Sequence, residues 1–140
     1  MFHPDLSIYT KQHDLLRELA MKSDCVIVGR CADYVLKELN PIRIFAYADM
    51  PSKIKRCMER RPEGENLNET QMKKSIEKID RSRAKYYSFF SGQKWGAREN
   101  YDLLINTSGA DVNALSSAFC RYIDTVSYTH LRAHETRHDL

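Results

Sequence analysis

The chain has 140 residues, of which 42% are hydrophobic and 29% are charged, and a formal net charge of +3. This length predicts one domain at most, with enough residues to bury a core. No apolar run approaches the ~20 residues of a membrane-spanning helix, and residues 1–10 have neither the basic nor the apolar region of a signal peptide. A mild positive charge allows an anionic small ligand but gives little support for nucleic-acid binding, which usually requires a clustered basic face. We therefore expect neither a membrane nor a nucleic acid as partner.

The first half of the chain alternates expected helices and strands. Leucine and alanine recur at helical spacing over residues 9–21, which predicts a helix. Residues 25–28 (CVIV) form a continuous apolar run, which is typical of a central parallel strand buried on both faces. Residues 31–39 predict a short helix that ends at an Asn-Pro pair, and residues 42–48 (IRIFAYA) predict a second buried strand.

The second half continues this alternation. Asp49 is the expected N-cap of a helix that ends near residue 61, with Pro51 in its first turn. Residues 62–68 are polar and contain Gly and Pro, which predicts a mobile loop. The next expected elements are a long helix, a third strand and a closing helix, over residues 69–90, 101–106 and 110–122. Strands that alternate with helices predict an α/β domain with a parallel sheet.

The four cysteines indicate the compartment. Cys25, Cys31, Cys57 and Cys120 form no C-x-x-C pair, and two of them lie in apolar runs. This pattern is typical of reduced core thiols in a cytoplasmic protein.

Gly29 and Arg30 follow the first expected strand, at the edge where open α/β sheets bind their ligands. A guanidinium group is always charged and binds phosphate oxygens in a bidentate manner. Asp33 lies one helical turn further on, where we expect it to orient the guanidinium. These residues predict a phosphate site; the alternative is a strand-end arginine paired with a surface carboxylate.

The long helix carries an arginine in its apolar face. The expected apolar stripe contains Met72, Ile76, Ile79, Tyr86 and Phe90. Arg83 lies in the same stripe, and an unpaired buried charge costs several kcal/mol. Arg83 must therefore meet either an internal carboxylate or a ligand phosphate. Asp80 is expected to position Arg81 or Arg83, or else to be an ordinary surface residue.

Further candidates lie beside the loop and after the third strand. Arg56 and Arg60 share a helix face next to residues 62–68, where a ligand contact and a solvated surface are equally good explanations. The side chains that close the third strand could meet a base or form a turn; they are Asn106, Thr107 and Ser108.

We interpret the last fifteen residues as sequence that does not belong to the protein itself. Back-translated, residues 126–136 (VSYTHLRAHET) match the end and adapter of a transposon-based sequencing library. We therefore expect residues 126–140 to be adapter read-through outside the fold, with 1–125 as the domain. Residues 134–138 fit the zinc-protease pattern H-E-x-x-H, with His130 four residues earlier. Their terminal position and adapter origin lead us to predict no metal site.

Four segments together resemble the cytidylate kinase-like family of P-loop nucleoside monophosphate kinases. They are residues 25–36 (CVIVGRCADYVL), 44–60 (IFAYADMPSKIKRCMER), 79–96 (IDRSRAKYYSFFSGQKWG) and 101–108 (YDLLINTS). The resemblance spans about residues 15–123. It implies a three-layer P-loop kinase-like fold with a parallel sheet, and phosphoryl transfer from Mg²⁺-ATP to a nucleoside monophosphate such as CMP or dCMP.

The resemblance also implies roles for the candidate residues. Residues 62–68 would be the lid over the site. The acceptor would be bound by Arg30, Asp33 and Asp80. Four arginines would be catalytic: Arg56 and Arg60 at the base of the lid, and Arg81 and Arg83, which would stabilise charge on the transferred phosphoryl group and hold the acceptor. The ATP base would lie near Asn106, Thr107 and Ser108.

The chain departs from the family pattern in one respect. None of its five glycines fits G-x-x-x-x-G-K-[ST], and the strand that precedes this loop in the family is also missing. That strand would lie between residues 25–29 and 42–48. We therefore expect this chain alone to bind ATP poorly, to be catalytically inactive and to fold marginally. Two alternatives stay open: a non-catalytic module that binds a phosphorylated ligand or a partner, and a shikimate kinase-like enzyme of the same fold.

Overall fold

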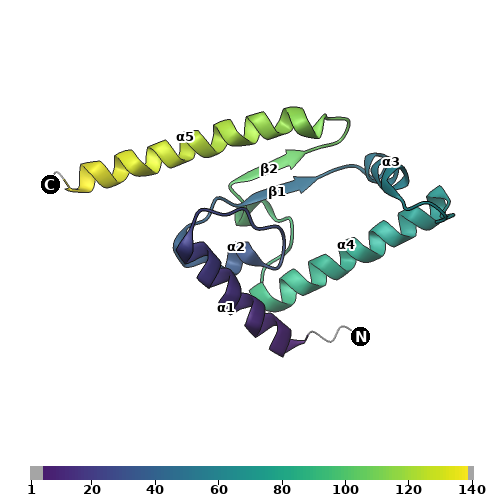
Figure 1. Cartoon of the computed structure of the whole chain (residues 1–140), viewed down its shortest axis with the longest axis horizontal. Coiled ribbons are helices and arrows are strands. Elements are labelled where there is room, and N and C mark those ends of the chain that lie inside the picture. Colours follow the sequence, from purple (N-terminus) through teal and green to yellow (C-terminus); the bar gives the residue numbers. More distant parts are fainter. Residues whose placement is uncertain (1–4, 139–140) are drawn as a thin grey trace.

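The computed structural model describes residues 5–138, and it describes side chains up to residue 127. The helices and strands are α1 (Leu6–Lys22), α2 (Ala32–Val35), the 3-10 turn η1 (Lys37–Leu39), β1 (Ile44–Tyr47), α3 (Met50–Arg60), α4 (Glu69–Ser91), the 3-10 turn η2 (Arg98–Asn100), β2 (Leu103–Asn106) and α5 (Val112–His138). Helices alternate with two strands that form a small parallel sheet (Figure 1). This architecture agrees with the expected α/β class.

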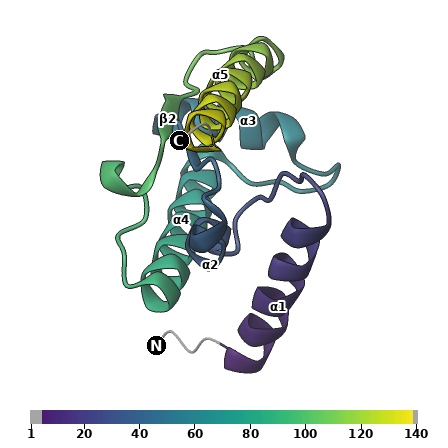
Figure 2. The same ribbon diagram turned by 90° about the vertical axis from the view of Figure 1, so that its left-hand side faces the viewer.

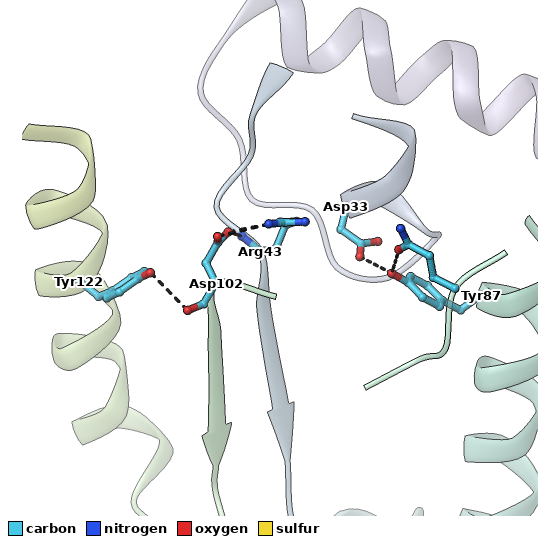
Figure 3. Close-up of polar contacts among 6 residues, drawn as sticks. Asp33, Arg43, Tyr87, Asp102 and Tyr122 are labelled. Carbon is cyan, nitrogen blue, oxygen red and sulfur yellow. Dashed lines mark hydrogen bonds and ion pairs between the residues drawn. The ribbon is translucent and has the colours of Figure 1, made fainter. Parts of the chain in front are cut away.

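The sheet is held in register at its first residues. β1 and β2 run parallel, with Ile44 opposite Leu103. The backbone N–H of Arg43 donates to Asp102 Oδ2 at 2.7 Å, and the Arg43 guanidinium lies 3.4 Å from the same carboxylate. Tyr122 from α5 donates to the Asp102 carbonyl at 3.5 Å (Figure 3). These contacts join α5 and both strands at the amino ends of the strands.

The expected strand over residues 25–28 is absent from the sheet. Residues 24–28 have no regular secondary structure, and Val26 and Val28 are 91% and 88% exposed. A strand needs a hydrogen-bonded neighbour, and within residues 5–138 the sheet contains β1 and β2 alone. The prediction of a buried central strand here is therefore wrong for this chain. The second expected strand forms, but Tyr47 at its end is exposed, so it is only partly buried.

The best-packed part of the core lies around α2. Ala32, Val35 and Leu36 are buried. They pack against half-buried side chains of α1 and of the segment after it, which are Tyr9, Leu16, Ala20 and Ile27. Figure 2 shows α2 between α1 and α4. The helix expected over residues 31–39 is thus real but interrupted at Leu36, where the 3-10 turn begins.

The long helix α4 begins and ends close to the expected residues. Asn68 and Gln71 form a capping box at its start, and Gly92 closes it in a left-handed conformation. Its buried residues are Met72, Ile76, Tyr87 and Ser91. Ile79 is half exposed, and the Arg83 side chain is 66% exposed. The expected stripe is therefore correct for Met72 and Ile76, and Tyr86 and Phe90 are half-buried against Tyr9. Arg83, by contrast, is not a core residue.

The start of α3 follows the prediction. Asp49 is the N-cap, and its Oδ1 accepts the backbone N–H of Ser52 at 2.8 Å. The hydrogen bonds from Ser52 hold the pKa of the Asp49 carboxyl below its usual value. A lowered pKa in the folded state means that Asp49 stabilises the fold above pH ~4 and that this contribution is lost as the pH falls further.

We expect the stability of the wild-type chain to fall more in acid than that of the Asp49→Asn variant. Asparagine keeps an N-cap oxygen but does not titrate. The measurement is urea unfolding, followed by circular dichroism, at pH 6 and at pH 3. The drop between the two pH values should be smaller for the variant. An equal drop would show that Asp49 does not contribute to the acid sensitivity.

The last helix, α5 (Val112–His138), continues past residue 122, where we expected it to end. The assignment of residues 126–140 to a sequencing adapter stays a prediction, which the backbone path does not test. The H-E-x-x-H residues and His130 lie outside the residues whose side chains are described. Among the helices described, none has the length and apolar character required to cross a membrane.

Candidate functional site

Three consecutive residues before α2 have left-handed backbone conformations. The φ angles are 73° at Gly29, 59° at Arg30 and 59° at Cys31. For a residue with a Cβ this conformation costs roughly 1 kcal/mol or more. The Cys31 side chain is buried, and its carbonyl accepts the backbone N–H groups of Tyr34 and Val35. Packing of α2 thus holds Arg30 in a strained turn, a feature that is common at functional sites.

The Arg30 guanidinium has no carboxylate partner among the residues with described side chains. Burial raises the pKa of the Tyr86 hydroxyl, and the nearby Arg30 charge partly offsets this rise. Our expectation that Asp33 orients Arg30 is not met. Asp33 instead accepts a hydrogen bond from Tyr87.

Tyr87 is at the centre of a polar cluster between α2 and α4 (Figure 3). Its side chain is only 4% exposed, and its hydroxyl lies 2.7 Å from Asp33 Oδ2 and 2.9 Å from Gln93 Oε1. Burial, together with the hydrogen bond to Asp33, raises the pKa of Tyr87, so it is protonated at neutral pH. Our sequence reasoning missed Tyr87 because it placed Tyr86 on the buried face. The pair of adjacent tyrosines, Tyr86 and Tyr87, was the feature of the sequence that could have indicated this residue.

Cys31 lies beside this cluster. Burial, with a smaller contribution from the Asp33 charge, raises the pKa of the Cys31 thiol to about 12. All four cysteines are free, and Cys25 and Cys120 are exposed. The expectation of a core thiol thus fits Cys31 and fails for Cys25, in the uncovered residues 24–28, and for Cys120, on an exposed part of α5.

We expect iodoacetamide at pH 8 to alkylate Cys25 and Cys120 and to leave Cys31 unmodified. The reactive species is the thiolate, which a raised pKa and burial both suppress. Peptide mass spectrometry after timed alkylation measures each site, and the same reaction in 6 M guanidinium chloride should modify all four cysteines. Native modification of Cys31 at the rate of Cys25 would contradict the buried geometry.

A second cluster joins α3 to α4. Lys53 Nζ lies 2.7 Å from Asp80 Oδ2, and the Arg83 guanidinium lies 3.7 Å from Asp80 Oδ1. Asp80 therefore holds two cations side by side, and of the roles we considered it positions Arg83 rather than Arg81. Lys53 was not among the sequence-derived candidates, because a lone lysine on an expected helix carries no signal of its partner.

The third cluster lies at the carboxyl ends of the strands. Arg56 from α3 donates to the hydroxyl of Thr107 at 2.9 Å and also to the Thr107 carbonyl. The Ser108 hydroxyl accepts the backbone N–H of Asp49 at 2.7 Å, and the Asn106 side chain accepts the backbone N–H of Ser108 at 3.0 Å. These groups join α3 to the turn after β2.

The remaining candidates stand apart. Arg60 and Arg81 are exposed and have no ion-pair partner in the described part of the chain. Across the loop after α3, it is Arg61 that contacts the far side, because its guanidinium donates to the Leu67 carbonyl at 2.9 Å. The structure therefore places most of the predicted residues in three separate clusters, and Arg60 and Arg81 lie outside them.

An open depression of about 420 Å³ lies where α3 meets the start of α4. Its lining residues are Pro51, Ile54, Lys55, Met58, Glu59 and Glu69. It contains none of the predicted site residues. The arginine positions, rather than this depression, define the candidate site.

A comparison with known families decides the relationship. The model of the cytidylate kinase-like family matches residues 3–109, which is 107 of the 140 residues. The chain belongs to the cytidylate kinase-like family. This membership confirms the resemblance found in the sequence, and it suggests a kinase-type role with a nucleotide substrate.

A solved structure is similar to this cytidylate kinase-like chain. It is the crystal structure of an uncharacterized protein from Eubacterium ventriosum ATCC 27560, which is 34% identical with a TM-score of 0.77. The match covers 89% of this chain and 69% of that chain. No curated protein matches the chain.

Proposed function

We propose that this cytidylate kinase-like chain takes part in phosphoryl transfer from ATP to a nucleoside monophosphate of the CMP or dCMP type. The observation that carries the proposal is the Arg30 guanidinium, which is held in a strained turn without a carboxylate partner in the described residues. An exposed guanidinium without a carboxylate partner is suited to a phosphate dianion. Phosphoryl transfer requires mainly positioned cations and the exclusion of water.

The other charged residues fit the same reaction. Lys53 and Arg83 share Asp80 and lie between α3 and α4, where a transferred phosphoryl group would meet two cations. Arg60 and Arg81 are available to the same phosphates if the loop over residues 62–68 closes. We assign the region of residues 106–108 to the ATP base, with Arg56 as its support.

Mg²⁺ would arrive with ATP. This ion usually keeps several waters and is bound by substrate phosphates with one or two carboxylates. Within the described side chains, no group of three or more His, Cys, Asp or Glu residues is arranged to hold a metal ion.

We also propose that the chain alone is catalytically inactive and that its complete form has a further strand and a phosphate loop. The exposed side chains of Val26 and Val28 support this proposal, because they lie where the sequence predicts a buried strand. The match covers 69% of the related crystal chain, which agrees with a segment that this chain lacks. The free cysteines favour a cytoplasmic location.

The test is a calorimetric titration of the full 140-residue chain with CMP, AMP, ATP and shikimate. We expect CMP to bind more tightly than AMP, ATP to bind weakly, and shikimate not to bind. A coupled assay should detect no turnover with ATP and CMP. Binding of shikimate without CMP would favour a small-molecule kinase, and turnover by this chain would contradict its proposed inactivity.

A further inference from the structure

The environment of Asp33 is unusual for a purely structural carboxylate. The residue is half-buried in the first turn of α2. No lysine, arginine or histidine lies within ion-pair distance of it in the part of the chain with described side chains. Oδ2 accepts the Tyr87 hydroxyl, and Oδ1 has no hydrogen-bond partner there. A half-buried charge with one open oxygen is costly to keep, and a neutral amide would join the two helices equally well.

The surroundings of Tyr87 fix its hydroxyl in this direction. A phenol has one proton, and the charged Asp33 carboxylate is a stronger acceptor than an amide oxygen. Because Tyr87 gives its one proton to Asp33, the contact with Gln93 is a hydrogen bond when the Gln93 side-chain amide is turned so that its NH₂ group donates to the Tyr87 oxygen. The backbone N–H of Gln93 donates to Ser91 Oγ at 3.0 Å, and Ser91 Oγ donates to the Tyr87 carbonyl at 2.5 Å. The end of α4 is thus built around the Tyr87 side chain.

The two neighbouring tyrosines of α4, Tyr86 and Tyr87, interact with residues of opposite charge. Tyr86 lies close to the Arg30 guanidinium, and Tyr87 holds the Asp33 carboxylate. Arg30 and Asp33 are three residues apart on one short, packed unit that begins with the left-handed turn. A ligand that places its phosphate on Arg30 therefore binds beside the packed unit that carries Asp33.

We infer that Tyr87 is a positioning residue for the acceptor, because it holds Asp33 with one oxygen free to accept a hydrogen bond from a hydroxyl or amine of the bound molecule. This inference rests on the proposed function. It specifies the ligand class further: a phosphate monoester that also carries a hydrogen-bond donor is bound in preference to phosphate alone. No group is transferred at Asp33 or Tyr87.

The test is calorimetry on the full chain with CMP and with inorganic phosphate as separate probes. We expect the wild type to bind CMP more tightly than phosphate. Tyr87→Phe should weaken CMP binding about tenfold and leave phosphate binding unchanged. In an Asp33→Asn background the same change should have no further effect, because Tyr87 acts through Asp33. Thermal unfolding of each variant establishes that it is folded.

Two further variants keep the result interpretable. Tyr122→Phe removes a hydroxyl that contacts the Asp102 carbonyl and neither Asp33 nor Gln93, and it should alter neither affinity. Gln93→Ala changes an exposed side chain that contacts the Tyr87 hydroxyl, and we expect it to weaken CMP binding about threefold. It serves as the test variant if Tyr87→Phe does not fold.

Three results would contradict this inference, and each leads to a different conclusion. Equal wild-type affinity for CMP and phosphate would overturn the role of Asp33 and Tyr87 while leaving the Arg30 phosphate site intact. A Tyr87→Phe effect that is equal for both probes, or that persists in the Asp33→Asn background, would reduce Tyr87 to a structural contact. Binding of neither probe would overturn the proposed function, and this inference with it.

Discussion

Replacing Arg30 with alanine is expected to weaken CMP binding about 100-fold. A bidentate guanidinium–phosphate contact contains two charge-assisted hydrogen bonds, each worth about 1.5–3 kcal/mol before losses to solvent. A net loss of about 2.7 kcal/mol corresponds to a factor of 100. Alanine keeps the Cβ that strains the left-handed turn, so the backbone energy at this position changes little. Calorimetric titration with CMP measures the effect.

Matched variants separate the guanidinium from its charge. Arg30→Lys keeps the positive charge and loses the planar fork, so we expect an intermediate loss of about tenfold. Arg121→Ala removes an exposed arginine on α5 and should leave the affinity unchanged. If Arg30→Ala and Arg121→Ala weakened CMP binding equally, the effect would come from overall charge, and Arg30 would have no specific place in the site.

Replacing Leu36 with alanine is expected to destabilise the fold by about 3 kcal/mol. Leu36 is 5% exposed and belongs to the cluster that joins α2 to α1. Truncation removes buried apolar surface and leaves a cavity that the surrounding side chains fill only in part. Urea unfolding at neutral pH measures the change in the free energy of unfolding.

Leu39→Ala is the matched control for this effect. Leu39 is three residues away and 41% exposed, so the same truncation should cost less than about 1 kcal/mol. Because α2 carries Asp33 and follows Arg30 directly, the Leu36 variant should also bind CMP more weakly than the Leu39 variant. Equal stability losses in the two variants would show that the α1–α2 cluster does not hold the fold together.

Local signals in the sequence predicted the helices well. Asp49 caps α3 as expected, and the bounds of α4 agree because Asn68, Gln71 and Gly92 are capping residues whose effect depends on the nearest turn of backbone. β2 also forms within the expected range. Such signals work because each involves residues only a few positions apart.

Signals that depend on a distant partner were less reliable. Residues 25–28 have the composition of a central strand, but no neighbouring strand in the described chain pairs with them, and the two valines are exposed. In the second half of α4 the periodic pattern identified a helix and placed Tyr86 inward. The packing of α2 instead buries Tyr87 and leaves Arg83 largely exposed.

The sequence by itself determined the family, the helical segments and the arginines that a phosphate site would use. The tertiary structure alone decided how those residues are paired: Asp33 with Tyr87, Asp80 with Lys53 and Arg83, and Arg56 with Thr107. These pairs join residues as many as 54 positions apart in the chain. Their formation depends on which faces of α2, α3 and α4 meet, and helical periodicity cannot show which neighbour a given face will contact.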